Sequence, residues 1–496
     1  MSDREKKRDL LELGRGSASS AIIQVFGAVF LYVYHIILAR FLGASDYGIF
    51  SFSLSLSTIV IVISQMGMQT GALRFTSSSL ANGNIGSFKG VLIRSHQLII
   101  ISGLSFLVIA FIVIKIFSNR FDSNIISALF LFMWLIPISG LMRVRQHILR
   151  GMKKIRLSLI PENIALPLLA TIFIVVLYWG GSLNLRSSII SYIISNILCL
   201  ILGWYYLSSS LSEDYKNAIP EYNTRELLKV SLPMMFSSMW QVFISRIDHV
   251  MIGTMLPMQE VGIYGAAVRT SLLIIFPATV VNAMLAPLIS GTHAKDENER
   301  LQYLVTTSLR WIMYITLPVT LLFLLNGKLI LKLYGSEFIY GSRAFLILVA
   351  AKSFSCIYGS VGYLLTMTGL QNKYAMVMIV SSFLNIAMNL YLIPELGIEG
   401  AAITSLVTTI CWNFWMGRIV SSRKKIRAYY IPGLRLIGIS IISIAVFYLF
   451  TSIISPYVGI ASFIFTYGIL VLVIGLEEDD RWLIGNIWKR GFYVPH

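Results

Sequence analysis

The segment Ser245-Arg246-Ile247-Asp248-His249 places two charged side chains and a histidine inside an apolar stretch of the chain. On a helix that turns about 100° per residue, Arg246 and His249 share a face, while Asp248 points about 200° away from Arg246. Arg246 and Asp248 therefore cannot neutralise each other on one helix. Each of them needs a partner on another element or a wet cavity.

Two further cations, Arg269 and Lys352, also lie within apolar stretches. An ionisable group at the centre of a bilayer costs about 2.5–3.5 kcal/mol, so such a residue indicates function by default. Arginine binds phosphate oxygens in pairs and lysine adds a point charge. Together with Arg246 and His249 these cations predict a substrate-binding site for an anionic headgroup, with structural ion pairs as the alternative. Asp248 binds a coupling ion or proton, or else fixes a cation in place.

An earlier apolar stretch carries Gln24, Ala28, Leu31 and His35 on one helical face, with 4-3-4 spacing. This stripe predicts that Gln24 and His35 line a cavity and touch sugar hydroxyls. The alternative for His35 is an interhelical hydrogen bond. The chain has no P-loop, no Gly-x-Ser-x-Gly and no paired histidines at metal-ligand spacing, so we expect no cofactor, no metal and no direct use of ATP.

The elements that position these residues are expected to be membrane-spanning helices. Of the 496 residues 56% are hydrophobic and 13% are charged, whereas soluble proteins carry about 25% charged residues. A helix needs about 20 apolar residues to cross a hydrocarbon core of about 30 Å. The pattern predicts an all-α, polytopic membrane protein with about 14 transmembrane helices.

The distribution of charge predicts the orientation. Lys and Arg number 40 and Asp and Glu 23, a net charge of +17. With a cytoplasmic N-terminus, the expected inner segments hold 30 of the 40 cations, the outer loops seven and the spans three. The positive-inside rule then predicts a cytoplasmic membrane protein with both termini in the cytoplasm. The basic run 143–156 would meet anionic lipids or recruit a diphosphate, and no nucleic-acid partner is expected.

Two internal matches indicate a repeat. Leu42–Phe50 aligns with Leu256–Tyr264 at an offset of 214, and Leu149–Lys154 aligns with Met367–Asn372 at 218. The match predicts two related halves of six helices with a common orientation. The expected parts are an N-terminal lobe (1–211), a cytoplasmic linker (212–229), a C-terminal lobe (230–420) and a C-terminal helix pair with a cytoplasmic tail (421–496). Asp46 is expected to cap a helix, and residues 477–480 to form a solvated acidic cluster.

Three stretches, 38–48, 253–264 and 385–402, resemble the polysaccharide and O-antigen flippases of the multidrug/oligosaccharidyl-lipid/polysaccharide exporter superfamily. The resemblance implies two pseudo-symmetric six-helix lobes around a central cavity, plus two C-terminal helices. It implies movement of polyprenyl-diphosphate-linked oligosaccharide from the inner to the outer leaflet by alternating access. The expected partners are this lipid, the surrounding membrane lipids, H⁺ or Na⁺ as coupling ion, and glycan polymerase or assembly proteins.

Two alternatives stay open. A multidrug exporter of the same fold would favour an anionic and aromatic cavity over a cationic one. A membrane-embedded polysaccharide polymerase or ligase would place polar residues in a sizeable outer loop, whereas the longest outer segment, around 327–341, is short. A transporter is therefore preferred to an enzyme.

Overall fold

The computed structural model describes residues 18–211 and 213–482, and every regular element in these ranges is helical. Eleven of the helices are long and apolar enough to cross a membrane, or up to twelve if the bent pair Met258–Ile274 and Phe276–Ala294 is one span. An all-α, multi-pass membrane fold is therefore confirmed. The expected number of about 14 spans is not confirmed.

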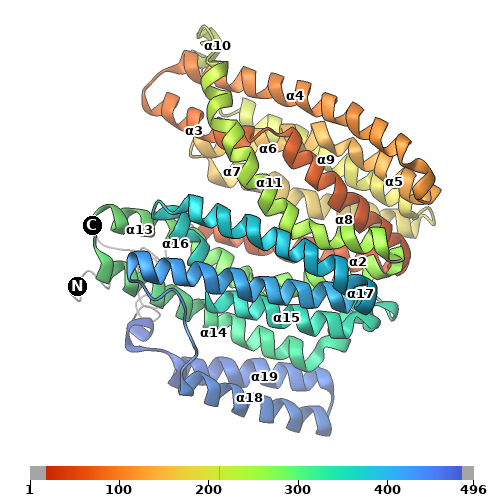
Figure 1. Cartoon of the computed structure of the whole chain (residues 1–496), viewed down its shortest axis with the longest axis vertical. Helices are drawn as coiled ribbons and strands as arrows, with labels where there is room; N and C mark the ends of the chain where they lie inside the picture. The colour runs from red at the N-terminus through yellow and green to blue at the C-terminus, as the bar shows by residue number, and fades with distance from the viewer. Residues whose placement is uncertain (1–17, 212, 483–496) are drawn as a thin grey trace.

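The first part of the chain forms one helical bundle, which occupies the upper half of Figure 1. Its first helix, α2, also runs along the second bundle. The helices are α2 (Ala18–Ser64), α3 (Met68–Ala81), α4 (Ile85–Ile116), α5 (Ser123–Met133), α6 (Leu135–Gly151), α7 (Ile155–Ile160), α8 (Leu166–Trp179) and α9 (Leu185–Ser208). Short π-helix η2 (Pro161–Ala165) joins α7 to α8.

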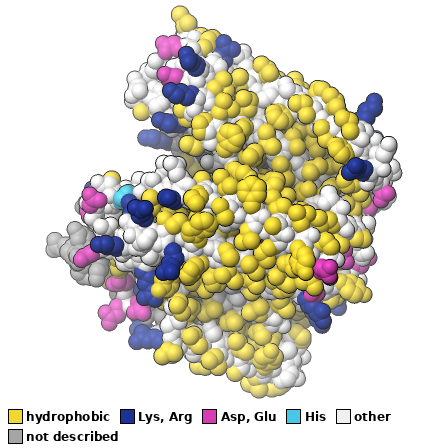
Figure 2. All heavy atoms as spheres, in the orientation of Figure 1, with side chains coloured by type: hydrophobic (Ala, Val, Ile, Leu, Met, Phe, Trp, Pro, Cys, Tyr) yellow, Lys and Arg dark blue, Asp and Glu magenta, His cyan; other side chains and the backbone are white. Residues whose placement is uncertain are grey.

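The second part forms a bundle below it, flanked by a C-terminal pair (Figure 1). Figure 2 shows a hollow between the two bundles on the left of the view, with Lys and Arg around its rim. The helices are α10 (Glu213–Asn217), α11 (Thr224–Met255), α12 (Met258–Ser271), α13 (Phe276–Ala294), α14 (Asn298–Leu331), α15 (Ser342–Ile357), α16 (Val361–Met367), α17 (Gln371–Lys424), α18 (Leu434–Ile453) and α19 (Pro456–Leu470). The 3₁₀-helix η4 (Glu337–Gly341) precedes α15.

Two of these helices are interrupted at a glycine. The backbone of α2 leaves the helical region at Gly43, where φ is 78°, and that of α17 leaves it at Gly397, where φ is 59°. Glycine adopts such positive φ values without the steric cost that a Cβ brings. Each half of α2 and α17 is long enough to cross a bilayer, since about 20 residues suffice.

The helix that starts after Gly43 is capped from the other bundle. Oε2 of Glu337 accepts a hydrogen bond of 3.1 Å from the backbone N–H of Ala44. The expected cap, Asp46, is half-buried and lies within the first turn, so its side chain is too far along the helix for that role. The cap of this helix therefore comes from Glu337 in the second bundle, and not from Asp46 in the same helix as predicted.

The two repeat-related turns meet each other directly. A Cβ at Gly48 would overlap the carbonyl oxygen of Met258, and a Cβ at Gly262 would overlap the carbonyl oxygen of Ala44. Position 44 corresponds to 258 and position 48 to 262 at the offset of 214. The contact between α2 and α12 is therefore reciprocal, as expected if the halves are related by a pseudo-twofold axis between these turns.

The segment between the bundles is bound to α4. The backbone N–H of Glu221 donates to the carbonyl of Gly86 at 3.0 Å, and Nδ2 of Asn84 donates to Oε2 of Glu221 at 3.0 Å. Helix α11 then begins beside α3, where Ser231 lies against Gly71. Since α11 contacts both bundles, the boundary expected at 230 stays a prediction.

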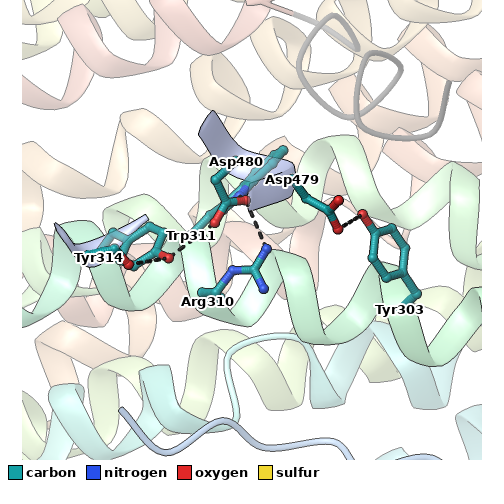
Figure 3. A network of polar contacts seen from close by, with 7 residues as sticks. Tyr303, Arg310, Trp311, Tyr314, Asp479 and Asp480 are labelled. Carbon is teal, nitrogen blue, oxygen red and sulfur yellow. Dashed lines mark hydrogen bonds and ion pairs between the residues drawn. The ribbon is translucent and has the colours of Figure 1, made fainter. Parts of the chain in front are cut away.

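The acidic segment after α19 is solvated only in part, because Glu477 and Glu478 are exposed as expected but Asp479 and Asp480 bind α14. Asp480 is 2% exposed, and its Oδ1 accepts from Nη2 of Arg310 at 2.9 Å and from Nε1 of Trp311 at 2.8 Å (Figure 3). Its Oδ2 accepts from the hydroxyl of Tyr314 at 3.1 Å. The chain folds back onto α14 here. Asp480, which the sequence predicts to be exposed, therefore joins the segment after α19 to α14 of the second bundle.

Candidate functional site

A cavity of about 330 Å³ brings together the charged residues that lie inside the apolar helices. Arg246, Asp248 and His249 reach it from α11, Arg269 from α12 and Lys352 from α15. Helix α17 forms a further wall, and α2 contributes Leu31. The structure thus gathers five of the seven candidate site residues around one space.

Neutral donors hold the carboxylate of Asp248. Its Oδ2 accepts from the hydroxyl of Tyr264 at 3.0 Å and from Oγ of Ser405 at 2.6 Å. Its Oδ1 accepts from Nδ2 of Asn389 at 2.8 Å. Arg246 makes no ion pair with it among the described residues, in line with their different directions on α11. Hydrogen bonds from protein groups therefore surround the Asp248 carboxylate.

The cations on the other side of the cavity lie close to one another. Arg246 and Arg269 are near enough for their charges to repel. The buried Nε of Arg269 and the buried Nδ1 of His249 have no hydrogen-bond partner in the described part of the chain. Buried polar atoms normally have partners. Unsatisfied nitrogen atoms beside two guanidinium groups suit an anionic ligand.

Sequence reasoning missed the wall formed by α17. Ser405, Thr408, Thr409 and Trp412 line the cavity with spacing that places them on one helical face. The signal was a run of polar residues at helical intervals inside an apolar span. Together with Lys352 on α15, they give the cavity hydroxyls and an aromatic ring in addition to charge.

Gln24 and His35 do not line this cavity. His35 is buried, its ring lies 5.0 Å from that of Tyr34, and its Nδ1 lies 3.4 Å from the hydroxyl of Tyr47. Tyr47 lies after the Gly43 break, so this contact joins the two halves of α2. Gln24 is half-buried on α2. A substrate contact for either residue stays a prediction. No cluster of His, Cys, Asp or Glu in the described ranges could hold a metal ion.

Comparison with known proteins gives two family models that match the chain. The model described as polysaccharide biosynthesis protein matches residues 13–293, more than half of the sequence, and the MatE model matches residues 233–391. A curated relative, the probable low-salt glycan biosynthesis flippase Agl15 of Haloferax volcanii, is 24% identical over 83% of this chain and 85% of its own length.

Solved structures share the fold at low identity. The lipid II flippase MurJ in an inward closed conformation superposes with a TM-score of 0.67 at 16% identity, covering 91% of this chain and 98% of that one. An inward-facing multidrug resistance MATE family transporter gives 0.66 at 16% identity, covering 82% and 99%. These likenesses confirm the architecture of two bundles.

Proposed function

The chain belongs to the polysaccharide biosynthesis protein family, and on this premise we propose that it is a flippase for polyprenyl-diphosphate-linked oligosaccharide. The lipid would move from the inner to the outer leaflet of the cytoplasmic membrane by alternating access. Its headgroup would occupy the cationic cavity, which is lined mostly by the second bundle, while its tail stays in the bilayer. The names of Agl15 and MurJ, a glycan biosynthesis flippase and a lipid II flippase, support this substrate class.

The observation that carries the proposal is the net positive charge of the side chains that line the cavity. Three cations line it, Arg246, Arg269 and Lys352, against one carboxylate, Asp248, which is already bound by three neutral donors. Burying cations without compensation costs several kcal/mol each. A diphosphate would supply the missing charge and accept from arginine nitrogens in pairs. A cavity for drug cations would need the opposite sign, so the multidrug alternative is disfavoured.

Complementation of a flippase-deficient cell tests the proposal. Replacing Arg246, Arg269 and Lys352 together by glutamine should abolish glycan export at normal expression, because the headgroup loses its counter-charges. The matched control is Arg343→Gln, which removes an exposed cation from the first turn of α15, the helix that carries Lys352. Normal export by the triple variant would refute the cavity assignment.

We further propose that Asp248 binds the coupling ion. Oδ1 of Asn389 is buried and has no hydrogen-bond partner among the described residues, and Asn389 touches Asp248 directly. Oxygen donors around a carboxylate fit Na⁺ or a proton and not a transition metal. Such an ion would supply the driving force that a chain without a P-loop cannot draw from ATP.

Orientation and chemistry complete the proposal. The excess of Lys and Arg in alternate loops supports cytoplasmic termini. The cavity residues form an ion and headgroup site, and no activated nucleophile is among them. Transport without catalysis is therefore preferred to a polymerase or ligase. Purified protein that joined or cleaved lipid-linked glycans would overturn this preference. Glycan polymerase and assembly proteins stay expected partners.

A further inference from the structure

A carboxylate that sequence reasoning did not single out lies inside the span Ile155–Trp179. Glu162 is the second residue of the π-helix η2, which interrupts this span between α7 and α8. A π-helical turn adds a residue to the helix and changes the direction of the side chains around it, and such turns occur frequently at functional sites. A carboxylate at membrane depth is also a functional candidate by default.

Among the described residues, the ion pair of the Glu162 carboxylate is with Arg143 and is long, while the charge of Arg150 acts on it from a greater distance. Nε of Arg143, on α6, lies 3.9 Å from Oε1 of Glu162, and the two side chains are 30% and 34% exposed. This separation exceeds the 2.7–2.9 Å that is usual for a charge-assisted hydrogen bond. An ionised carboxylate has about four acceptor positions. Glu162 therefore keeps most of its capacity to accept hydrogen bonds.

Helix packing places η2 beside the wall of the central cavity. A Cβ at Gly27 of α2 would overlap the backbone of Asn163, the residue after Glu162, so α2 and η2 are in direct contact. One turn later on α2, Leu31 lines the cavity. The π-helix thus lies one helical turn from the space that holds the charged residues.

Electrostatics gives the same placement. Tyr192, on α9, is within electrostatic reach of Glu162 on the side of the first bundle and of Arg246 and Arg269 on the side of the second. Arg143 is likewise near enough to Arg246 for their charges to act on each other. The pair Arg143–Glu162 therefore lies within electrostatic reach of the arginines of the cavity.

We propose that Glu162 is a glycan-binding residue, which accepts hydrogen bonds from sugar hydroxyls while the diphosphate occupies the cationic cavity. The inference rests on the proposed function and adds the part of the substrate that the first bundle recognises. A carboxylate suits hydroxyl-rich sugar and repels diphosphate, so the two bundles divide the headgroup by chemistry. Arg143 positions the carboxylate.

The alternative is a purely structural role, in which the Arg143–Glu162 ion pair only stabilises the first bundle. The two roles differ in what a charge swap does. Exchanging the pair by Arg143→Glu with Glu162→Arg keeps the attraction between the two positions, but it moves the carboxylate off η2 onto α6. A structural pair would be restored by the swap, whereas a glycan contact would not.

Binding measurements on the purified full-length protein test the proposal with two probes. One is native lipid-linked oligosaccharide extracted from the complemented host, and the other is polyprenyl diphosphate without sugar. Glu162→Gln should weaken binding of the glycan-bearing lipid by about tenfold, since hydrogen bonds to a charged group are lost. It should leave binding of polyprenyl diphosphate within about twofold of the wild type. The charge-swapped variant should show the same selective loss.

Glu399→Gln is the matched control, because Glu399 forms an equally loose ion pair of 3.8 Å with the exposed Arg343. It should change neither affinity. Equal loss for both lipids, no loss, or recovery by the charge swap would each overturn the role of Glu162. Should Glu162→Gln unfold, Glu162→Asp keeps the charge with a shorter reach and is held to the same selective loss. Wild-type protein that binds neither lipid would instead overturn the flippase proposal itself.

Discussion

Asp248 differs from the other charged residues of the cavity in how it is held. Three neutral donors satisfy its oxygens, while Nε of Arg269 and Nδ1 of His249 have no hydrogen-bond partner among the described residues. This contrast separates an ion site from a headgroup site within one cavity. Sequence reasoning placed Asp248 on a different helical direction from Arg246, and that difference is why the two residues meet different partners.

At the residue scale we expect Asp248→Asn to fold and to lose ion-dependent transport. Oδ1 of Asn389 has no donor in the described structure, so the Asn389 amide can turn and accept from the new side chain. The charge that would attract Na⁺ or a proton is gone. The measurement is flipping in vesicles with and without an imposed Na⁺ or H⁺ gradient. Asp46→Asn, beside the Gly43 break of α2 and outside the cavity, is the control. Gradient-driven flipping by Asp248→Asn would refute the coupling role.

A site residue could be predicted from the sequence only where its own position, and not a distant partner, gave the signal. Arg246, Arg269 and Lys352 stood out because a charge inside an apolar run is costly whatever surrounds it. Glu162 escaped notice because a π-helix is set by packing and not by composition. Asp480 was misjudged because its donors lie about 170 positions earlier on α14, and no local pattern reveals so distant a contact.

At the element scale, the repeat gave more than a count of helices. Its glycines proved to be the points where α2 and α12 touch, although their pairing across the bundles could not be deduced from an alignment of one half with the other. A contact of backbone on backbone tolerates no side chain. It is therefore the contact between α2 and α12 that a single methyl group should disturb most directly.

We expect Gly262→Ala to open the outer end of the cavity. The added methyl group would overlap Ala44 and push α2 away from α12. The measurement uses Ser245→Cys, which lines the cavity, in a Cys411→Ser background, labelled by an impermeant maleimide added outside the cell. Labelling of Ser245→Cys should be several-fold higher with Gly262→Ala than with Gly262 intact. The reason is that alternating access requires these turns to separate when the cavity faces outward.

Gly400→Ala supplies the control for this experiment. Its Cβ would also overlap a backbone carbonyl, that of Leu392, but both residues belong to α17. Strain within one helix pair should leave the labelling of Ser245→Cys unchanged. Equal labelling of the two glycine variants would show that local destabilisation, and not separation of the bundles, controls access.

At the scale of the whole molecule, composition and charge were sufficient for the class of fold. A chain with 13% charged residues must present most of its surface to lipid. The number of spans was harder, because a helix that continues through a glycine break is one element by hydrogen bonding and two by topology. Gly43 and Gly397, with their positive φ values, are the positions where these descriptions diverge.

Labelling of single cysteines, in a Cys411→Ser background, decides whether α2 and α17 each form one membrane span or two. If each half of α2 and α17 is a span, Ser45→Cys and Leu396→Cys, both exposed beside the glycine breaks, should react with an impermeant reagent outside intact cells. Tyr340→Cys, between α14 and α15, should react on the same side. Lys154→Cys, between α6 and α7, should react only after permeabilisation, because the positive-inside rule places that loop in the cytoplasm. Labelling of Lys154→Cys in intact cells would invert the proposed orientation, and protection of Ser45→Cys beside a reactive Tyr340→Cys would make α2 a single span.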